Sequence, residues 1–149
     1  MLKKFEEKRL FYLKKQLAYC KNSSLFFRKL FEKNKISIDR IDSLQKWKDL
    51  PVLMDKKIVR DCQNDSMKIS SHAFGSHMCA PLEKVVYVYS TSGTTGNPSF
   101  YCFTKNDFKV HTTLVKRVMK FTGLKKGDSI MWGFGLGNFV ATSLLPILA

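Results

Sequence analysis

Residues 85–103 read VVYVYSTSGTTGNPSFYCF and place a glycine-rich loop between two strand-like segments. The first, Val85–Tyr89, consists entirely of β-branched and aromatic residues, which are typical of strands. The second, Phe100–Phe103, has a similar character. We therefore predict a hairpin in which Ser90–Ser99 joins two strands.

Helical patterns precede this hairpin. From Phe5 to about Cys20, apolar residues recur at steps of three and four, which predicts a helix with a stripe of leucines. That stripe contains Leu10, Leu13 and Leu17. Shorter helices are predicted for residues 25–32, for residues 43–50, and after Asp55, whose side chain can cap a helix carrying Ile58 and Val59. Residues 63–82 lack periodicity and are predicted to form a loop.

Further elements are expected after the hairpin. Residues 107–121 predict a helix with Phe108, Leu114 or Val115, and Val118 facing inward, and residues 129–132 predict a buried strand. Strands alternating with helices indicate an α/β fold. We expect a helical N-terminal segment with a loop over residues 1–82 and an α/β domain beginning at residue 83. Because the sequence closes on the apolar run SLLPILA, we expect that domain to be incomplete at residue 149.

The chain is strongly basic, with a formal net charge of +14. Residues 1–60 hold 17 basic and 7 acidic residues, so most of the excess lies far from the glycine-rich loop. A nucleic-acid-binding module would interleave Lys or Arg with exposed aromatic rings on one face. The phenylalanines of this region fall mostly on apolar stripes, so we expect them in the core and predict solvated lysines without a nucleic-acid partner. They are Phe5, Phe11, Phe26, Phe27 and Phe31.

Cysteine usage and hydropathy predict a cytoplasmic protein without a membrane partner. The four cysteines contain no CxxC pair, which favours reduced thiols over a disulfide framework or a zinc ribbon. His72, His77 and Cys79 lie close in sequence but lack a fourth ligand nearby, so we predict a polar loop and no metal site. The N-terminus has no uninterrupted apolar signal region, and the C-terminal apolar stretch is too short to span a bilayer.

The loop itself has the composition of a phosphate cradle. Its glycines let backbone N–H groups approach an anion, and its hydroxyls add uncharged hydrogen-bonding groups. The pattern is not a Walker A motif, which ends in Gly-Lys-Ser/Thr, and GxGxxG is absent. From composition alone, a Ser/Thr-rich turn without a ligand remains an alternative.

The stretch STSGTTGNPS resembles the signature loop of the adenylate-forming superfamily, and within it the phenylacetate–CoA ligases and their relatives. Residues 26–61, the segment Phe103–Asp107, and GLKKGDSIMWGFGLG after it resemble segments of those ligases in the same order. The resemblance covers roughly residues 20 to 140. It implies an N-terminal fragment: a helical cap followed by the beginning of the large N-terminal α/β domain.

The resemblance also implies a reaction. A carboxylic acid, such as an aryl acid, attacks ATP to give an acyl-adenylate, and coenzyme A then displaces AMP. The loop would hold the β- and γ-phosphates with Mg²⁺ sharing their charge. The residues implied are Thr91, Ser92, Gly93, Thr94, Thr95 and Gly96. Phe134 corresponds to a stretch that helps to line the acyl pocket in aryl-acid ligases, although plain core packing is the alternative for it.

Other features limit what the resemblance implies. Ser99 stands where many superfamily members carry Lys, although phenylacetate–CoA ligase relatives tend to have a small hydroxyl residue there. The family's ribose-contacting aspartate and catalytic lysine lie further along, so we assign no catalytic residue here and expect no turnover from these 149 residues alone. Related aryl-acid ligases often form dimers, so a homodimer is one arrangement that the resemblance implies for the full-length protein, and no interface can be read from this sequence. A different acceptor, as in coenzyme adenylylation or polysaccharide biosynthesis, and an inactive gene remnant both remain open.

Overall fold

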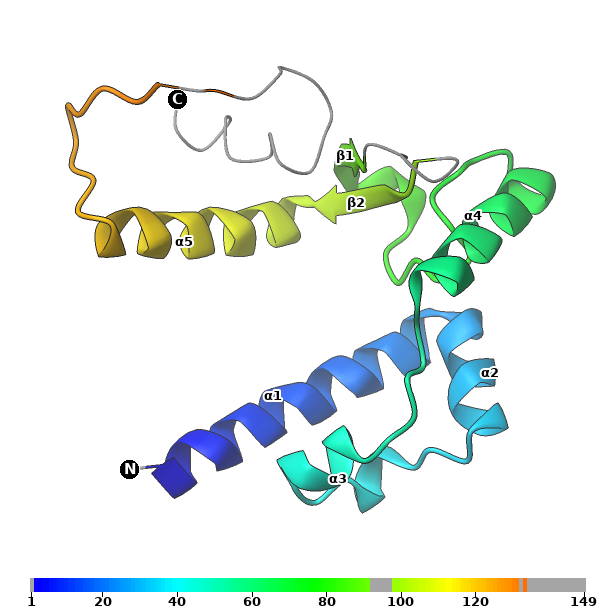
Figure 1. The fold of residues 1–149 in the computed structure, drawn as a ribbon. Helices are drawn as coiled ribbons and strands as arrows, with labels where there is room; N and C mark the ends of the chain where they lie inside the picture. The colour runs from blue at the N-terminus through cyan, green and yellow to red at the C-terminus, as the bar shows by residue number, and fades with distance from the viewer. Residues whose placement is uncertain (1, 92–97, 132, 134–149) are drawn as a thin grey trace. The chain divides into compact units, whose positions relative to one another are not determined.

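The computed structural model describes residues 2–91, 98–131 and 133, and the chain divides into two compact units, Met1–Cys79 and Ala80–Ala149 (Figure 1). The first unit is helical. Its elements are α1 (Leu2–Ser23), α2 (Leu25–Lys33), the 3₁₀ turn η1 (Ile38–Arg40), α3 (Leu44–Lys48) and α4 (Lys56–Ser70). In the second unit, the 3₁₀ turn η2 (Leu82–Lys84) precedes β1 (Val85–Ser90), β2 (Phe100–Thr104) and α5 (Lys105–Phe121).

The core of the first unit lies where α1 meets α2 and the chain that follows α2. Leu17, Phe31 and Ile41 are buried there. Leu10 and Leu13 of α1 pack against these three residues, so the predicted leucine stripe is confirmed as the inner face of α1. Further half-buried side chains complete the cluster: Phe27, Ile36, Ile38, Trp47, Leu50 and Leu53.

The predicted Asp55 cap is confirmed, and a second cap, which was not predicted, forms at Ser43. The Asp55 carboxylate accepts a hydrogen bond from the backbone N–H of Ile58 at 2.7 Å and starts α4. The Ser43 hydroxyl accepts one from the N–H of Lys46 at 3.2 Å and starts α3. Each bond satisfies an N–H that the first helical turn would otherwise leave unpaired.

The loop predicted for residues 63–82 is wrong over its first part, because α4 continues to Ser70. The buried face of α4 consists of Cys62, Gln63 and Ser66, which are not the apolar residues that a periodicity search recognises. The Ser66 hydroxyl explains why a polar residue is tolerated there. Its single O–H proton lies within reach of the carbonyls of Gln63 and His72, with oxygen–oxygen distances of 3.0 and 2.8 Å, and its oxygen accepts from the N–H of Gly75 at 2.9 Å.

The second unit is built on the predicted hairpin, which is confirmed. β1 and β2 pair antiparallel, with Tyr89 opposite Tyr101 and Ser90 opposite Phe100, and an irregularity lies between Val85 and Tyr87. α5 begins at the residue after β2. Thr104 is therefore both the last residue of the strand and the N-cap of the helix, and it forms a capping box with Asp107.

Two predictions for this unit are wrong in part. On α5, Val115 is buried and Phe108 is half-buried, as predicted, but Val118 is 62% exposed, because inward packing ends about one turn earlier, at Val115. The buried strand predicted for residues 129–132 is absent over residues 129–131, where Met131 is 96% exposed. A strand needs a hydrogen-bonded neighbour, and in the described part of the chain the sheet holds only β1 and β2. Trp132 lies outside the described residues.

The expected core positions of two phenylalanines are also wrong. Phe5 and Phe11 on α1 are 58% and 63% exposed, whereas Phe31 is buried and Phe26 and Phe27 are half-buried. At 3.6 residues per turn, the leucine stripe and these two rings point to different sides of α1. None of the described helices combines the length and apolar character needed to cross a bilayer.

Candidate functional site

The strands of the hairpin are fastened together at the two residues that flank the glycine-rich loop. The backbone N–H of Thr91 donates to the carbonyl of Ser99 at 3.0 Å. In return, the N–H of Ser99 donates to the Thr91 side-chain oxygen, also at 3.0 Å. The second bond uses a side-chain acceptor, so position 91 needs a residue with a side-chain oxygen, which Thr91 supplies. These two bonds fix the ends of the loop relative to each other.

Ser99 is the most deeply buried residue at this place. It is 1% exposed, and its hydroxyl oxygen has no hydrogen-bond partner. A buried hydroxyl without a partner costs free energy, so its presence needs a reason beyond packing. One part of that reason is the backbone of Ser99, whose carbonyl and N–H form the two bonds with Thr91. In the sequence, Ser99 stood out only because many superfamily members carry Lys at this position. Its burial could not be predicted from the sequence.

Aromatic rings from both strands support the hairpin on α5. Tyr87 stacks on Phe108 of α5 with ring centroids 4.5 Å apart, and Tyr89 meets Phe103 edge to face at 5.4 Å. Tyr89 is buried, and burial raises the pKa of its phenol. Because successive strand residues point to opposite faces, Tyr87 and Tyr89 share one side of β1. The rings thus anchor the hairpin that carries the loop.

Of the predicted phosphate-binding residues, only Thr91 is among those that the structure describes. Ser92, Gly93, Thr94, Thr95 and Gly96 lie outside the described residues, as does Phe134. Their assignment to a phosphate loop and an acyl pocket stays a prediction. The structure adds the positions at which the loop leaves β1 and enters β2.

The titratable groups near the hairpin are poor candidates for acid–base or nucleophilic chemistry. Burial raises the pKa of the Cys102 thiol on β2 to about 11, so this thiol is protonated at neutral pH. In the first unit, burial and the neighbouring Cys20 raise the pKa of Cys79 to about 12. Among the described residues, no cluster of three or more His, Cys, Asp or Glu side chains is placed to bind a metal.

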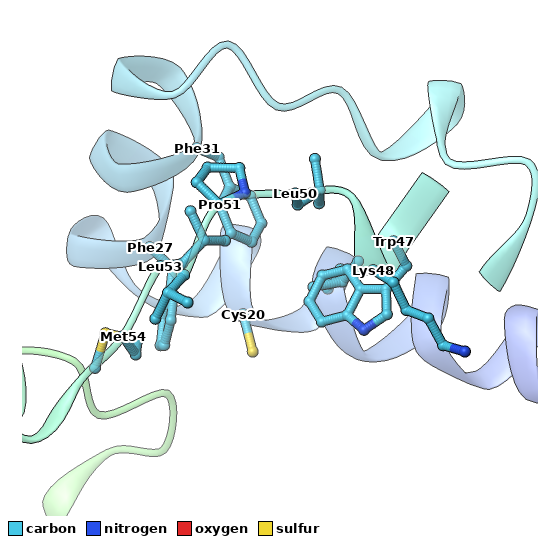
Figure 2. Close-up of a pocket in the computed structure, with 11 residues that line it drawn as sticks. Cys20, Phe27, Phe31, Trp47, Lys48, Leu50, Pro51, Leu53 and Met54 are labelled. Atoms are coloured by element: carbon cyan, nitrogen blue, oxygen red, sulfur yellow. The ribbon is translucent and has the colours of Figure 1, made fainter. Parts of the chain in front are cut away.

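A separate pocket of about 380 Å³ lies in the first unit, among α1, α2, α3 and the segment after α3 (Figure 2). Its lining is almost wholly apolar, with Lys48 as the single charged side chain. Figure 2 shows Phe27, Phe31 and Trp47 around it, with Cys20 on the α1 side. The described lining contains no carboxylate or imidazole.

Comparison with known proteins assigns the family. No family model matches the chain. A phenylacetate–coenzyme A ligase from Thermus thermophilus is 29% identical over 138 residues, which cover 93% of this chain and 28% of the ligase. One from Aromatoleum evansii is 30% identical over 113 residues, covering 76% of this chain and 23% of the ligase. The resemblance to the adenylate-forming family is confirmed.

Comparison with solved structures confirms the α/β fold class. The chain superposes on an open conformation of 2-hydroxyisobutyryl-CoA ligase with a TM-score of 0.75 and 21% identity, over 96% of this chain and 32% of the ligase. The same ligase in its thioesterification state gives a TM-score of 0.72 with 22% identity, over 86% and 26% of the two chains. The chain thus spans about a quarter of the length of the adenylate-forming relatives it matches.

Proposed function

We propose that this chain forms the N-terminal part of an ATP-dependent carboxylate–CoA ligase. The reaction would join a carboxylic acid to AMP with release of pyrophosphate, and coenzyme A thiol would then displace AMP to give the thioester. An aryl acid such as phenylacetate is the favoured substrate, because the curated relatives are phenylacetate–CoA ligases. The proposal extends to a cytoplasmic enzyme that is homodimeric when full length.

One structural observation supports the role of the loop: its two ends are held together by the bonds between Thr91 and Ser99. A loop whose ends are already fixed loses less chain entropy when it orders around an anion. Hydroxyls and backbone N–H groups would then surround the β- and γ-phosphates, while Mg²⁺ would neutralise part of their charge. Thr91 would contribute in two ways: its bonds with Ser99 hold the ends of the loop together, and it stands directly beside the phosphate-binding residues.

The test is binding of MgATP and of tripolyphosphate to this chain, measured by isothermal titration calorimetry. Both ligands should bind, and tripolyphosphate should compete with ATP, because the loop is proposed to contact phosphates and not the base. The double variant Thr94→Val/Thr95→Val should lower the affinity for both ligands about tenfold or more. Each ligand would lose charge-assisted hydrogen bonds from the two hydroxyls to its phosphates.

A matched control is Thr112→Val/Thr113→Val on α5. These hydroxyls donate to backbone carbonyls of their own helix, so their loss should leave phosphate binding unchanged. Equal loss of affinity in both double variants, or no binding by the unsubstituted chain, would show that the loop is a turn without a ligand.

The identity of the acceptor needs the longer protein. A chain continued to the length of the relatives should release AMP and form a thioester with phenylacetate, ATP and coenzyme A. If hydroxylamine traps an acyl-adenylate but coenzyme A yields no thioester, the acceptor is different and the enzyme belongs with other adenylating relatives.

A further inference from the structure

One face of α1 collects basic and aromatic side chains that lie outside the core cluster of the first unit. One of them, Tyr19, donates a hydrogen bond from its hydroxyl to the carbonyl of Cys79 at 3.1 Å, which leaves part of its ring exposed. At about 100° per residue, the side chains concerned span roughly 160° of the helix surface. The aromatic members Phe5, Phe11 and Tyr12 are 58%, 63% and 56% exposed, and Tyr19 is 47% exposed. The other exposed members are Lys4, Lys8, Arg9, Lys15 and Gln16. We refer to these nine residues as the basic–aromatic face.

The charge of this face has a single sign. It carries three lysines and one arginine, whereas the only acidic residues of α1, Glu6 and Glu7, fall outside the arc. The guanidinium of Arg9 lies 5.7 Å from the centre of the Phe5 ring, so cation and ring already share one site. Such a surface attracts a polyanion, and it repels a second copy of itself.

The apolar groups on this face are all rings. The leucines of α1 at positions 10, 13 and 17 belong to the opposite stripe and pack in the core. A helix that binds a lipid surface presents Trp, Phe or Leu side chains to the acyl chains and keeps its basic residues on the opposite face, whereas here the cations and the rings share one face. Single-stranded nucleic acid requires a different combination: flat rings on which bases stack, with cations beside them for the phosphates. The basic–aromatic face meets this second requirement.

We propose that the basic–aromatic face of α1 binds single-stranded nucleic acid. Stacking on Phe11, Tyr12 and Tyr19 would hold the bases, and Lys4, Lys8 and Lys15 would contact the phosphates. Because every base offers a flat ring, this mode of binding tolerates any sequence. The inference rests on α1 alone and stands independently of the ligase proposal.

The test is fluorescence anisotropy of a labelled oligodeoxythymidine titrated with the 149-residue chain at several salt concentrations. Binding should weaken steeply with salt, because each phosphate contact releases condensed counterions. The triple variant Lys4→Gln/Lys8→Gln/Lys15→Gln should bind more weakly and reduce the slope of log K against log salt by about 2, since each single-strand contact contributes about 0.7. Circular dichroism should show unchanged helix content.

Net charge is controlled by Lys116→Gln/Lys120→Gln/Lys126→Gln, which removes three exposed charges from the second unit and should leave affinity and slope nearly unchanged. The rings are tested by Phe11→Leu/Tyr12→Leu, which keeps charge and apolar bulk and should lower affinity about fivefold or more through lost stacking. Equal losses in both lysine triples, or an unchanged affinity in the leucine variant, would overturn the proposal. So would binding to phosphatidylserine vesicles without binding to the oligonucleotide.

Discussion

At the residue scale, the Ser99 hydroxyl is a buried group whose removal should help folding. It is 1% exposed and has no hydrogen-bond partner, so Ser99→Ala should raise the free energy of unfolding by about 1 kcal/mol. Thr91→Val should act in the opposite direction and lower it by about 1 kcal/mol, because the N–H of Ser99 then loses its acceptor. Urea denaturation of both variants measures the difference. A destabilised Ser99→Ala variant would show that the hydroxyl has a partner in solution.

A second prediction at the residue scale concerns His77 and the dependence of folding stability on pH. Burial lowers its pKa below the usual 6.5, and its Nδ1 atom is buried without a partner. Below about pH 6.5 the unfolded chain takes up a proton that the folded chain resists, so stability should fall as the pH drops from that value through the folded pKa. The contribution is absent above pH 6.5.

The measurement is the free energy of unfolding at about pH 7.5 and about pH 5.5. His77→Phe keeps a ring against Phe26 and should flatten this dependence. An equal fall in stability in that variant would assign the effect to other groups.

At the scale of single elements, Thr104 connects β2 to α5 with no linking residue. Its side-chain oxygen accepts from the N–H of Asp107 at 3.2 Å, and the Asp107 carboxylate accepts from the N–H of Thr104 at 2.9 Å. Thr104→Ala should therefore lower the free energy of unfolding by about 1 kcal/mol, whereas Thr104→Ser should retain most of it. Chemical denaturation followed by circular dichroism distinguishes them. Equal stability of the alanine and serine variants would contradict the capping role.

The loss of an aromatic ring should affect folding stability very differently in the core of the first unit and on the exposed face of α1. Phe31 is 2% exposed in the core, so Phe31→Ala should cost about 3 to 5 kcal/mol. Phe11 is 63% exposed, and Phe11→Ala should change stability by no more than about 0.5 kcal/mol. Similar losses in the two variants would place Phe11 in the core after all.

At the scale of the whole molecule, we predict that this chain alone forms no acyl-adenylate. It spans about a quarter of the length of its curated relatives. Incubation with phenylacetate, MgATP and hydroxylamine should yield no hydroxamate, while tripolyphosphate still binds. Turnover would show that these residues suffice for the first half-reaction.

Sequence reasoning succeeded where the signal was local. The hairpin, the Asp55 cap and the leucine stripe each depend on a few neighbouring residues, and the structure confirms all three. It failed where the burial of a residue depends on its position in three dimensions. Apolar spacing could not show that Phe5 and Phe11 point away from the leucines, and the polar buried face of α4 gave no apolar period to detect.

The bonds between Thr91 and Ser99 also bear on how this hairpin tolerates changes in length. They hold β1 and β2 in register at the ends of the strands, without needing any contact from the seven residues between Thr91 and Ser99. Extra residues inserted there would add only the slowly growing cost of closing a longer loop, about 0.6 kcal/mol for each doubling. The strands would keep their pairing, so the hairpin can serve as a frame in which loops of different length are exchanged.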